Sequence, residues 1–195
     1  FKVGGIQADA ENYSKVYDGS PIVLKADFGD LVQVTSYQWY VVKNDGSVES
    51  VEGATGQQYN VTDVLQSGTY FCVGKDSDEN SYVTVKKTTT ISQATDTITI
   101  TDDPGKVYDG TPVADPSFNK DSKNNGSTIA YTYYQKNSDN TYSPISGAPK
   151  DAESYAVEVK VSGDPNYHDA TSAKKDFVIS KKPITIKAKS ASKTY

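Results

Sequence analysis

The sequence predicts an all-β chain that forms two antiparallel β-sandwiches in tandem. Three observations carry this prediction: apolar and polar residues alternate with period two, turn-forming residues separate the alternating runs, and one seven-residue motif occurs twice in the 195 residues. Period-two alternation places every second side chain on one face of a strand, which is typical of half-buried antiparallel sheets. No stretch of similar length shows helical periodicity.

The repeated motif divides the chain. It reads Lys-Val-Tyr-Asp-Gly-Ser-Pro from Lys15 and Lys-Val-Tyr-Asp-Gly-Thr-Pro from Lys106, a spacing of 91 residues (106 − 15). Lys193-Thr194-Tyr195 would begin a third copy 87 residues later (193 − 106). This period corresponds to one small domain per repeat and is too long for a solenoid unit. We therefore expect a first unit at 1–94, a second at 95–182, and the first strand of a truncated third repeat at 183–195.

The alternating runs and the turns between them locate individual strands. The run at 155–161 is the clearest, since its tyrosine and three valines share one face. Similar alternation at 97–101 and 184–188 predicts the opening strands of the second and third units. Asn, Asp, Gly and Pro at 44–46 and 163–166 predict the turns. Many short strands separated in this way are typical of an antiparallel sandwich.

The first unit carries the sequence marks of an immunoglobulin-like sandwich. Trp39 matches the tryptophan of the third strand, and Tyr70 stands two residues before Cys72, which is the spacing of a tyrosine corner. Cys72 is the only cysteine, so no disulfide can form within the chain. Counting back from Trp39, we expect Ala26 to face Cys72 across the core.

The second unit can be aligned with the first. Tyr133 falls on Trp39 and Tyr155 falls on Tyr70. The distance between these two landmarks shrinks from 31 residues (70 − 39) to 22 residues (155 − 133). The second unit is therefore expected to be a smaller sandwich with fewer middle strands.

The order of motifs in the second unit resembles a known family. The Lys-Val-Tyr-Asp-Gly-Thr-Pro opening, the strand at 155–161, Asn166-Tyr167 and the closing Asp176–Ser180 together are similar to the YDG or MBG repeat modules of bacterial surface proteins. The resemblance implies a tandemly repeated, extracellular, immunoglobulin-like bacterial protein. Such proteins are often tethered to the cell wall, many of them use packing in place of disulfides, and most have no assigned ligand.

The motif itself has a physical rationale. Gly19 and Gly110 can take a positive φ, and the preceding aspartate can cap the turn through its carboxylate. The tyrosine can bury its ring beside the junction between domains. We therefore interpret both copies as structural, and they comprise Tyr17, Asp18, Gly19, Tyr108, Asp109 and Gly110.

Composition argues against catalysis and nucleic-acid binding. The 20 basic residues are all lysines, and 25 acidic residues bring the net charge to −5. A basic face and arginine forks for nucleic acid are therefore not expected. The single histidine, His168, and Cys72 cannot supply a catalytic triad or a Cys/His zinc site. We expect no enzyme, no catalytic residue and no cofactor.

Two groups of residues are candidates for binding. Tyr134 and Tyr142 would expose rings that could stack on a sugar or contact a host protein. Asp76, Asp78 and Asn80 place oxygen ligands at alternate positions, as a calcium loop does, although the glycine and distant glutamate of an EF-hand are missing. A Lys–Asn isopeptide crosslink stays open as well, since no pair is singled out by spacing.

The combined interpretation is a non-catalytic stalk or spacer, with an adhesive role, in a larger bacterial cell-surface protein. Its expected partners are neighbouring repeats of the same chain, and a host protein or glycan is the alternative partner. Apolar runs are only a few residues long, far short of the roughly 20 that a membrane span needs, so no membrane contact is expected.

Overall fold

The chain is all-β. The computed structural model describes residues 3–8, 13–30, 32–189 and 191–193. Within these residues the only helical element is a short 3₁₀ helix, η1 (Val64–Gln66), and everything else of regular structure is strand. No helix among the described residues is long and apolar enough to span a membrane. The predicted fold class is confirmed.

The chain folds into two compact units. The first contains Phe1–Asp96 together with two loops from later in the sequence, Ser122–Gly126 and Gly163–Asp169. The second contains the remaining segments, which are Thr97–Asp121, Ser127–Ser162 and Ala170–Tyr195. A simple division of the sequence at residue 94 would place both of these loops in the second unit. In the structure they pack with the first unit.

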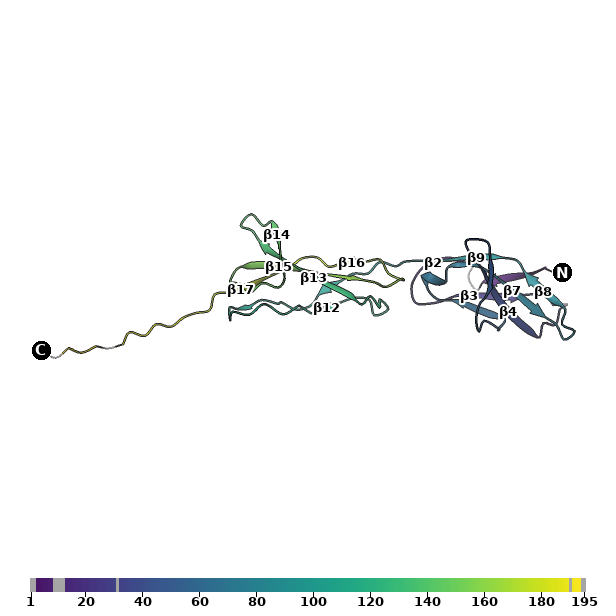
Figure 1. Ribbon diagram of the computed structural model, residues 1–195, viewed down its shortest axis with the longest axis horizontal. Coiled ribbons are helices and arrows are strands. Elements are labelled where there is room, and N and C mark those ends of the chain that lie inside the picture. Colours follow the sequence, from purple (N-terminus) through teal and green to yellow (C-terminus); the bar gives the residue numbers. More distant parts are fainter. Residues whose placement is uncertain (1–2, 9–12, 31, 190, 194–195) are drawn as a thin grey trace. The chain divides into compact units, whose positions relative to one another are not determined.

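The first unit is a sandwich whose two sheets are joined at one edge (Figure 1). One sheet has the order β1–β3–β6 and the other has the order β2–β9–β7–β4–β5, while β8 pairs with both β1 and β7. All pairs are antiparallel except β2 with β9 and β1 with β8. The strands are β1 (Val3–Ala8), β2 (Ser14–Val16), β3 (Ile22–Asp27), β4 (Ser36–Val42), β5 (Val48–Ser50), β6 (Gln58–Val61), β7 (Gly68–Lys75), β8 (Ser81–Thr84) and β9 (Lys87–Ser92).

The core of the first unit follows from the alternation in its strands. In β3 every second residue is buried, and Ala26 ends this inward row with no exposed surface. Trp39 and Cys72 are also fully buried and lie directly opposite each other on β4 and β7. The indole N–H of Trp39 donates to the carbonyl of Gly56 at 2.9 Å, which satisfies its polar atom. An alanine and a thiol thus occupy, in the same core, the places expected of a disulfide.

The second unit repeats the larger sheet of the first. Its order β11–β17–β15–β13–β14 matches β2–β9–β7–β4–β5, and in both sheets the first pair is parallel. The opposite side is reduced to the two short strands β10 and β12. The strands are β10 (Thr99–Ile100), β11 (Lys106–Val107), β12 (Phe118–Asn119), β13 (Thr128–Lys136), β14 (Tyr142–Ile145), β15 (Ser154–Ser162), β16 (Ala170–Thr171) and β17 (Lys175–Ser180).

Strand register supports the alignment of the two units. Tyr133 lies opposite Val157, as Trp39 lies opposite Cys72. Tyr133 is 3% exposed and Val157 is fully buried, so the central pair of each unit sits in its own core. No strand occurs between β14 and β15, which agrees with the shorter spacing in the sequence.

Each unit contains a tyrosine corner. The Tyr70 hydroxyl donates to the carbonyl of Gln66 at 2.5 Å, and the Tyr155 hydroxyl donates to the carbonyl of Asp151 at 3.1 Å. Both bonds reach back four residues to the loop before the strand, and both tyrosines are buried. They anchor this loop to the core at the start of β7 and of β15.

The strand expected at 183–195 is not formed in the described part of that segment, 183–189 and 191–193. Ile184 and Ile186 are 82% and 86% exposed, whereas the matching Ile98 and Ile100 are buried. The difference has a simple cause: Ile100 is paired with β12 at Phe118, and the described residues after Ser180 supply no such partner. An isolated strand has no ladder to hold it.

Removal of the first tyrosine corner tests its contribution. Tyr70→Phe leaves the carbonyl of Gln66 without its buried donor and should lower the unfolding free energy of the first unit by about 1–2 kcal/mol. Chemical denaturation followed by Trp39 fluorescence reports on this unit alone, since Trp39 is the only tryptophan. Tyr40→Phe, in the same unit, is the matched control and should change little. Equal midpoints for Tyr70→Phe and the parent chain would show that the corner does not stabilise the fold.

Candidate functional site

The repeated motif begins on a parallel strand pair at the edge of each sheet. In the first unit β2 runs parallel to β9, and the amide of Tyr17 donates to the carbonyl of Ser92 at 2.9 Å. In the second unit β11 runs parallel to β17, and the amide of Tyr108 donates to the carbonyl of Ser180 at 2.8 Å. The Tyr-Asp-Gly turn therefore follows directly after the last hydrogen bond of the pair in both units.

A lysine at the start of the first motif binds back onto its turn. The Lys15 ammonium donates to the carboxylate of Asp18 at 2.5 Å, and to the hydroxyl and carbonyl of Ser20 at 2.6 Å each. The same carboxylate oxygen accepts from the Ser20 amide at 2.8 Å and from its hydroxyl at 2.7 Å. The lysine side chain is only 22% exposed, so the ammonium is held within the turn.

The second motif repeats this network. The Lys106 ammonium donates to the Asp109 carboxylate and to the Thr111 hydroxyl, at 2.7 Å in both cases, and to the carbonyl of Pro112 at 3.2 Å. The Thr111 amide and hydroxyl donate to Asp109 at 2.9 and 2.8 Å. Two turns 91 residues apart (106 − 15) thus share the lysine–aspartate and hydroxyl bonds, with threonine in place of serine, and differ only in the carbonyl that the lysine reaches.

Glycine and a charged carboxylate complete each turn. Gly19 and Gly110 have φ values of +82° and +83°, a left-handed conformation that a side chain would strain. The hydrogen bond from Lys15, followed by those from Ser20, holds the pKa of Asp18 well below its usual range. The bonds from Lys106 and Thr111 lower the pKa of Asp109 in the same way. Each turn is therefore expected to keep its carboxylate charged to a lower pH than an ordinary aspartate would.

The two tyrosines expected to bind sugars lie next to each other on the outer face of the second unit. Tyr134 on β13 and Tyr142 on β14 have ring centroids 6.4 Å apart and meet edge to face, while Tyr133 points into the core. The Lys174 ammonium lies 4.1 Å from the Tyr134 ring centroid, which is cation–π distance. The rings therefore do not form one flat platform, and one face of Tyr134 is occupied by a cation.

The hydroxyl groups of the same two tyrosines are also engaged. The Tyr134 hydroxyl donates to Glu158 at 2.5 Å, and the Tyr142 hydroxyl donates to Asp176 at 2.7 Å. Lys174 pairs with Glu158 at 3.0 Å, and Lys136 pairs with Asp176. The hydrogen bond to Glu158 is the main cause of the raised pKa of Tyr134. This group is an internally paired surface cluster of alternating rings, cations and carboxylates.

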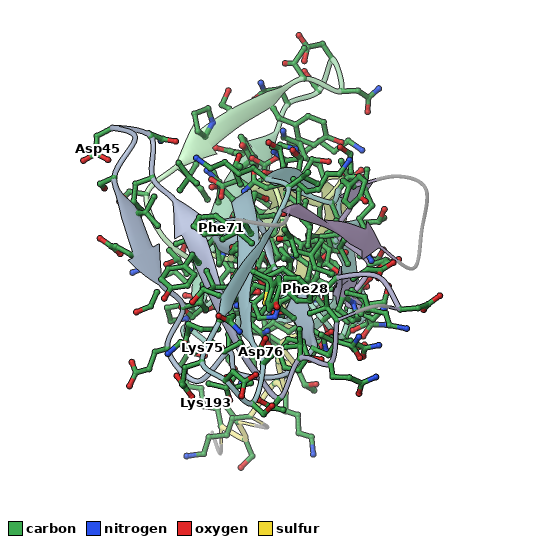
Figure 2. All side chains as sticks on the ribbon, turned by 90° about the vertical axis from the view of Figure 1, so that its right-hand side faces the viewer. Phe28, Asp45, Phe71, Lys75, Asp76 and Lys193 are labelled. Atoms are coloured by element: carbon green, nitrogen blue, oxygen red, sulfur yellow. The ribbon has the colours of Figure 1, made fainter. Side chains whose placement is uncertain are left out.

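The proposed calcium residues form a hairpin tip between β7 and β8. The Asp76 carboxylate accepts from the amides of Asp78 and Asn80, both at 2.9 Å, and from the Tyr82 hydroxyl at 2.9 Å. The side-chain amide of Asn80 donates to Asp76 as well, at 3.0 Å. Figure 2 shows Lys75 and Asp76 together at this end of β7. Asp76 is thus engaged by its own loop, and a metal at this tip stays a prediction.

The two residues that could support catalysis differ in exposure, since one is buried and the other lies on the surface. Cys72 is fully buried in the core of the first unit, and burial raises the pKa of its thiol to about 11. His168 is exposed in the loop 163–169, where its amide donates to the carbonyl of Ala94 at 2.9 Å. Among the described residues no group of three or more His, Cys, Asp or Glu could hold a metal ion.

A groove that the sequence did not indicate lies beside the β4–β5 hairpin of the first unit. It has a volume of about 720 Å³ and runs between this hairpin and η1. Leu65 on η1 is 77% exposed at its rim, and Lys43 pairs with Glu49 at 3.0 Å on the hairpin. Figure 2 shows Asp45 at the tip of the hairpin. The groove is lined by mixed polar and apolar residues with no convergent set of charges.

The sequence identified the Tyr-Asp-Gly turns but missed the residues that fix them. Lys15, Lys106, Ser20 and Thr111 belong to the repeated motif, yet only its central three residues were singled out as structural. The available signal was the repetition of the whole motif, because a lysine three residues before an aspartate recurs in both copies.

Comparison with known proteins adds little to this description. No protein-family model matches the chain, and no curated protein matches it. Among solved structures, the chain is similar to fibronectin(III)-like modules of Clostridium thermocellum CbhA at 10% identity, with 95% of this chain and 100% of that chain covered and a TM-score of 0.28. It is similar to murine CEACAM1b at 12% identity, with coverages of 91% and 99% and a TM-score of 0.30. These scores are too low to support an argument, so the fold assignment rests on the strand pairing.

The lowered pKa of Asp18 predicts an acid-dependent stability. A carboxyl group whose pKa is lower in the folded than in the unfolded chain contributes stability above its unfolded value of about 4, and this contribution is lost as the pH falls further. Carboxyl carbon shifts followed by NMR should therefore give Asp18 a titration midpoint well below the usual range, and Lys15→Met should raise it. Asp109, whose pKa is lowered by its own lysine in the second unit, is the matched control, and Lys15→Met should leave its midpoint unchanged. An Asp18 midpoint that Lys15→Met does not move would show that the ion pair is absent in solution.

Proposed function

We propose that this chain is a non-catalytic spacer that carries mechanical tension in a longer extracellular protein of a bacterium. In this proposal the two units are tandem structural modules, and they project an adhesive or catalytic region located elsewhere in the parent protein. The observation that carries the proposal is the parallel pairing of the second and the last strand of each unit, β2 with β9 and β11 with β17.

Parallel pairing of the second and the last strand has a mechanical consequence. Once the strand that precedes the pair, β1 or β10, has detached, pulling the ends of the unit apart makes the two paired strands slide along each other, and their hydrogen bonds are loaded together rather than one after another. The Lys–Asp turn lies immediately after this pair in both units. A turn that is closed by an ammonium and by backbone amides keeps the end of the strand from peeling. The same device in both units supports a role that both units share.

The resemblance to YDG or MBG surface modules supports the location of the proposed spacer. Those modules occur in tandem on bacterial surfaces, and the absence of any disulfide agrees with a sandwich held by packing alone. Neighbouring repeats of the same chain are the proposed partners. The tyrosine corners and the disulfide-free cores supply each unit with its own stability.

The alternative function is recognition of a carbohydrate or a host protein by the second unit. Tyr134 and Tyr142 favour it through their position on an outer sheet face. Their hydroxyl groups are bound to Glu158 and Asp176, and Lys174 covers one ring, so a ligand would have to displace several internal contacts. The spacer is therefore the better-supported function.

Single-molecule pulling of the 1–195 chain tests the spacer. We expect one force peak for each unit, because each has its own parallel edge pair. Tyr17→Pro removes the amide that donates to Ser92 and should lower one of the two peaks, since forced unfolding depends on the bonds that are loaded first. Tyr17→Ala removes the ring but keeps the amide and should retain more of the force. If Tyr17→Pro and Tyr17→Ala unfold at the same force, the parallel pair does not carry the tension.

A binding screen tests the alternative. The 1–195 chain is presented to arrays of glycans and of extracellular matrix proteins, in parallel with its Tyr134→Ala and Tyr142→Ala variants. The spacer predicts no saturable binding by any of the three proteins. Saturable binding by the parent chain that either substitution abolishes, with the fold intact by circular dichroism, would establish the recognition function instead.

A further inference from the structure

The surface around the first Tyr-Asp-Gly turn is covered within the first unit. The ring of Tyr167, which is 4% exposed, meets the ring of Tyr17 edge to face with centroids 5.6 Å apart. The backbone beside it is paired as well: the Ala94 amide donates to the carbonyl of Asn166, and the His168 amide donates to the carbonyl of Ala94, both at 2.9 Å. The loop 163–169 thus lies along the chain that follows β9 and against the turn that follows β2.

The loop 122–126 covers the other side of the same turn. The Lys123 ammonium donates to the carbonyl of Asp18 at 2.7 Å. A Cβ atom placed on Gly19 would lie 2.8 Å from the side chain of Lys123, so the lysine stem rests directly on the glycine. The turn that closes the parallel pair is therefore a contact surface as well as a cap.

Buried polar bonds fix the two covering loops to each other and to the first unit. Asp164 is 7% exposed and accepts from the amides of Asn125 and Asn166. The Asn166 side chain in turn accepts from the amide of Val64 at 2.9 Å, at the start of η1. These bonds present Tyr167 and Lys123 in defined positions, so the two loops act as one recognition element.

The equivalent surface of the second unit is open. Tyr108 is 39% exposed, and no described ring packs against it. A Cβ atom on Gly110 would meet nothing within 4 Å, whereas one on Gly19 would meet Lys123. A groove of about 380 Å³ adjoins the turn, lined by Tyr108, Ala152, Lys181, Lys182 and the exposed Ile184.

The open surface of the second unit carries the same kinds of group as the covered surface of the first unit. Aligned on the last residues of the paired strands, Ser92 and Ser180, Lys181 takes the place of Gln93. The Gln93 side chain donates to the carbonyls of Pro165 and Tyr167, at 3.3 and 3.1 Å, and a lysine can donate to the same type of acceptor. The second unit therefore offers the same three kinds of group in the same order as the first: the ring of Tyr108, the carbonyl of Asp109 and the side-chain donor of Lys181.

We propose that the surface formed by Tyr108, Gly110 and Lys181–Ile184 is a docking surface for the paired loops of a further repeat unit. The occupant presents a tyrosine to Tyr108 and a lysine to the Asp109 carbonyl, as the loops 163–169 and 122–126 do at Tyr17 and Asp18. The proposal rests on the tandem-module function and names the partner that such a module takes.

An extended chain tests the docking surface. Residues 1–195 are followed directly by a second copy of residues 109–182, so that Lys193-Thr194-Tyr195 opens the added unit in register with the motif. Hydrogen–deuterium exchange is then compared with that of the 1–195 chain. The amide of Lys182, which corresponds to the bonded amide of Ala94, should exchange at least about tenfold more slowly in the extended chain. Peptides covering 106–110 should also gain protection.

A matched variant identifies the contact. Tyr167→Ala together with Lys123→Ala in the added copy alone should return Lys182 to its original exchange rate while the copy stays folded. An internal duplication, residues 1–182 followed by 97–195, repeats the test with a different junction in case one junction fails to fold. The proposal would be overturned by an added unit that folds but leaves the amides of Lys182 and Tyr108 unprotected. It would also be overturned if the 1–195 chain gained the same protection when its concentration is raised, because a second copy of the chain would then be the occupant. The pulling experiment uses the 1–195 chain, so its outcome is independent of this one.

Discussion

The closure of the Tyr-Asp-Gly turn by a lysine is the interaction on which the edge of each unit depends. The Lys15 and Lys106 ammonium groups each bind one carboxylate and the serine or threonine that follows it. The last hydrogen bonds of the parallel pairs, at Tyr17 and Tyr108, immediately precede these turns. Because parallel neighbours need a long connection rather than a hairpin, nothing local joins β2 to β9 or β11 to β17. The turn instead fixes the backbone directly after β2 and after β11, where the paired strands end.

The two units share a framework and differ in what covers it. Both keep the five-strand sheet, the parallel edge pair, the tyrosine corner and a central pair in register, Trp39 with Cys72 and Tyr133 with Val157. The second unit has reduced its opposite sheet to β10 and β12. A smaller sheet buries less apolar surface, yet β15 alone buries three valines and a tyrosine in the core. The two units therefore share one sheet with its edge pair and differ in the strands on the opposite side.

Local patterns in the sequence predicted most of the fold. Alternation located β15, the Trp39 motif located β4, and the spacing of Tyr70 from Cys72 predicted the corner that its hydroxyl forms. Strand formation at 184–188 could not be predicted in the same way, because alternation shows which face a strand would bury but does not supply its partner. The internal pairing of Tyr134 and Tyr142 could not be predicted for a similar reason. Their partners are distant in the sequence, since Lys174 directly precedes β17 and Asp176 lies within it.

Hydrogen exchange at the two turns tests most directly whether the lysine–aspartate turn holds the parallel pair. The amides of Tyr17 and Tyr108 are the last donors of β2 and β11, and they can be followed by NMR in Asp18→Asn and Asp109→Asn variants. Each substitution should speed the exchange of the amide at its own turn. The exchange rates of the amide at the other turn and of the Trp39 amide, which is bonded to the carbonyl of Ala54, should stay unchanged. Unchanged exchange at Tyr17 in Asp18→Asn and at Tyr108 in Asp109→Asn would contradict the account.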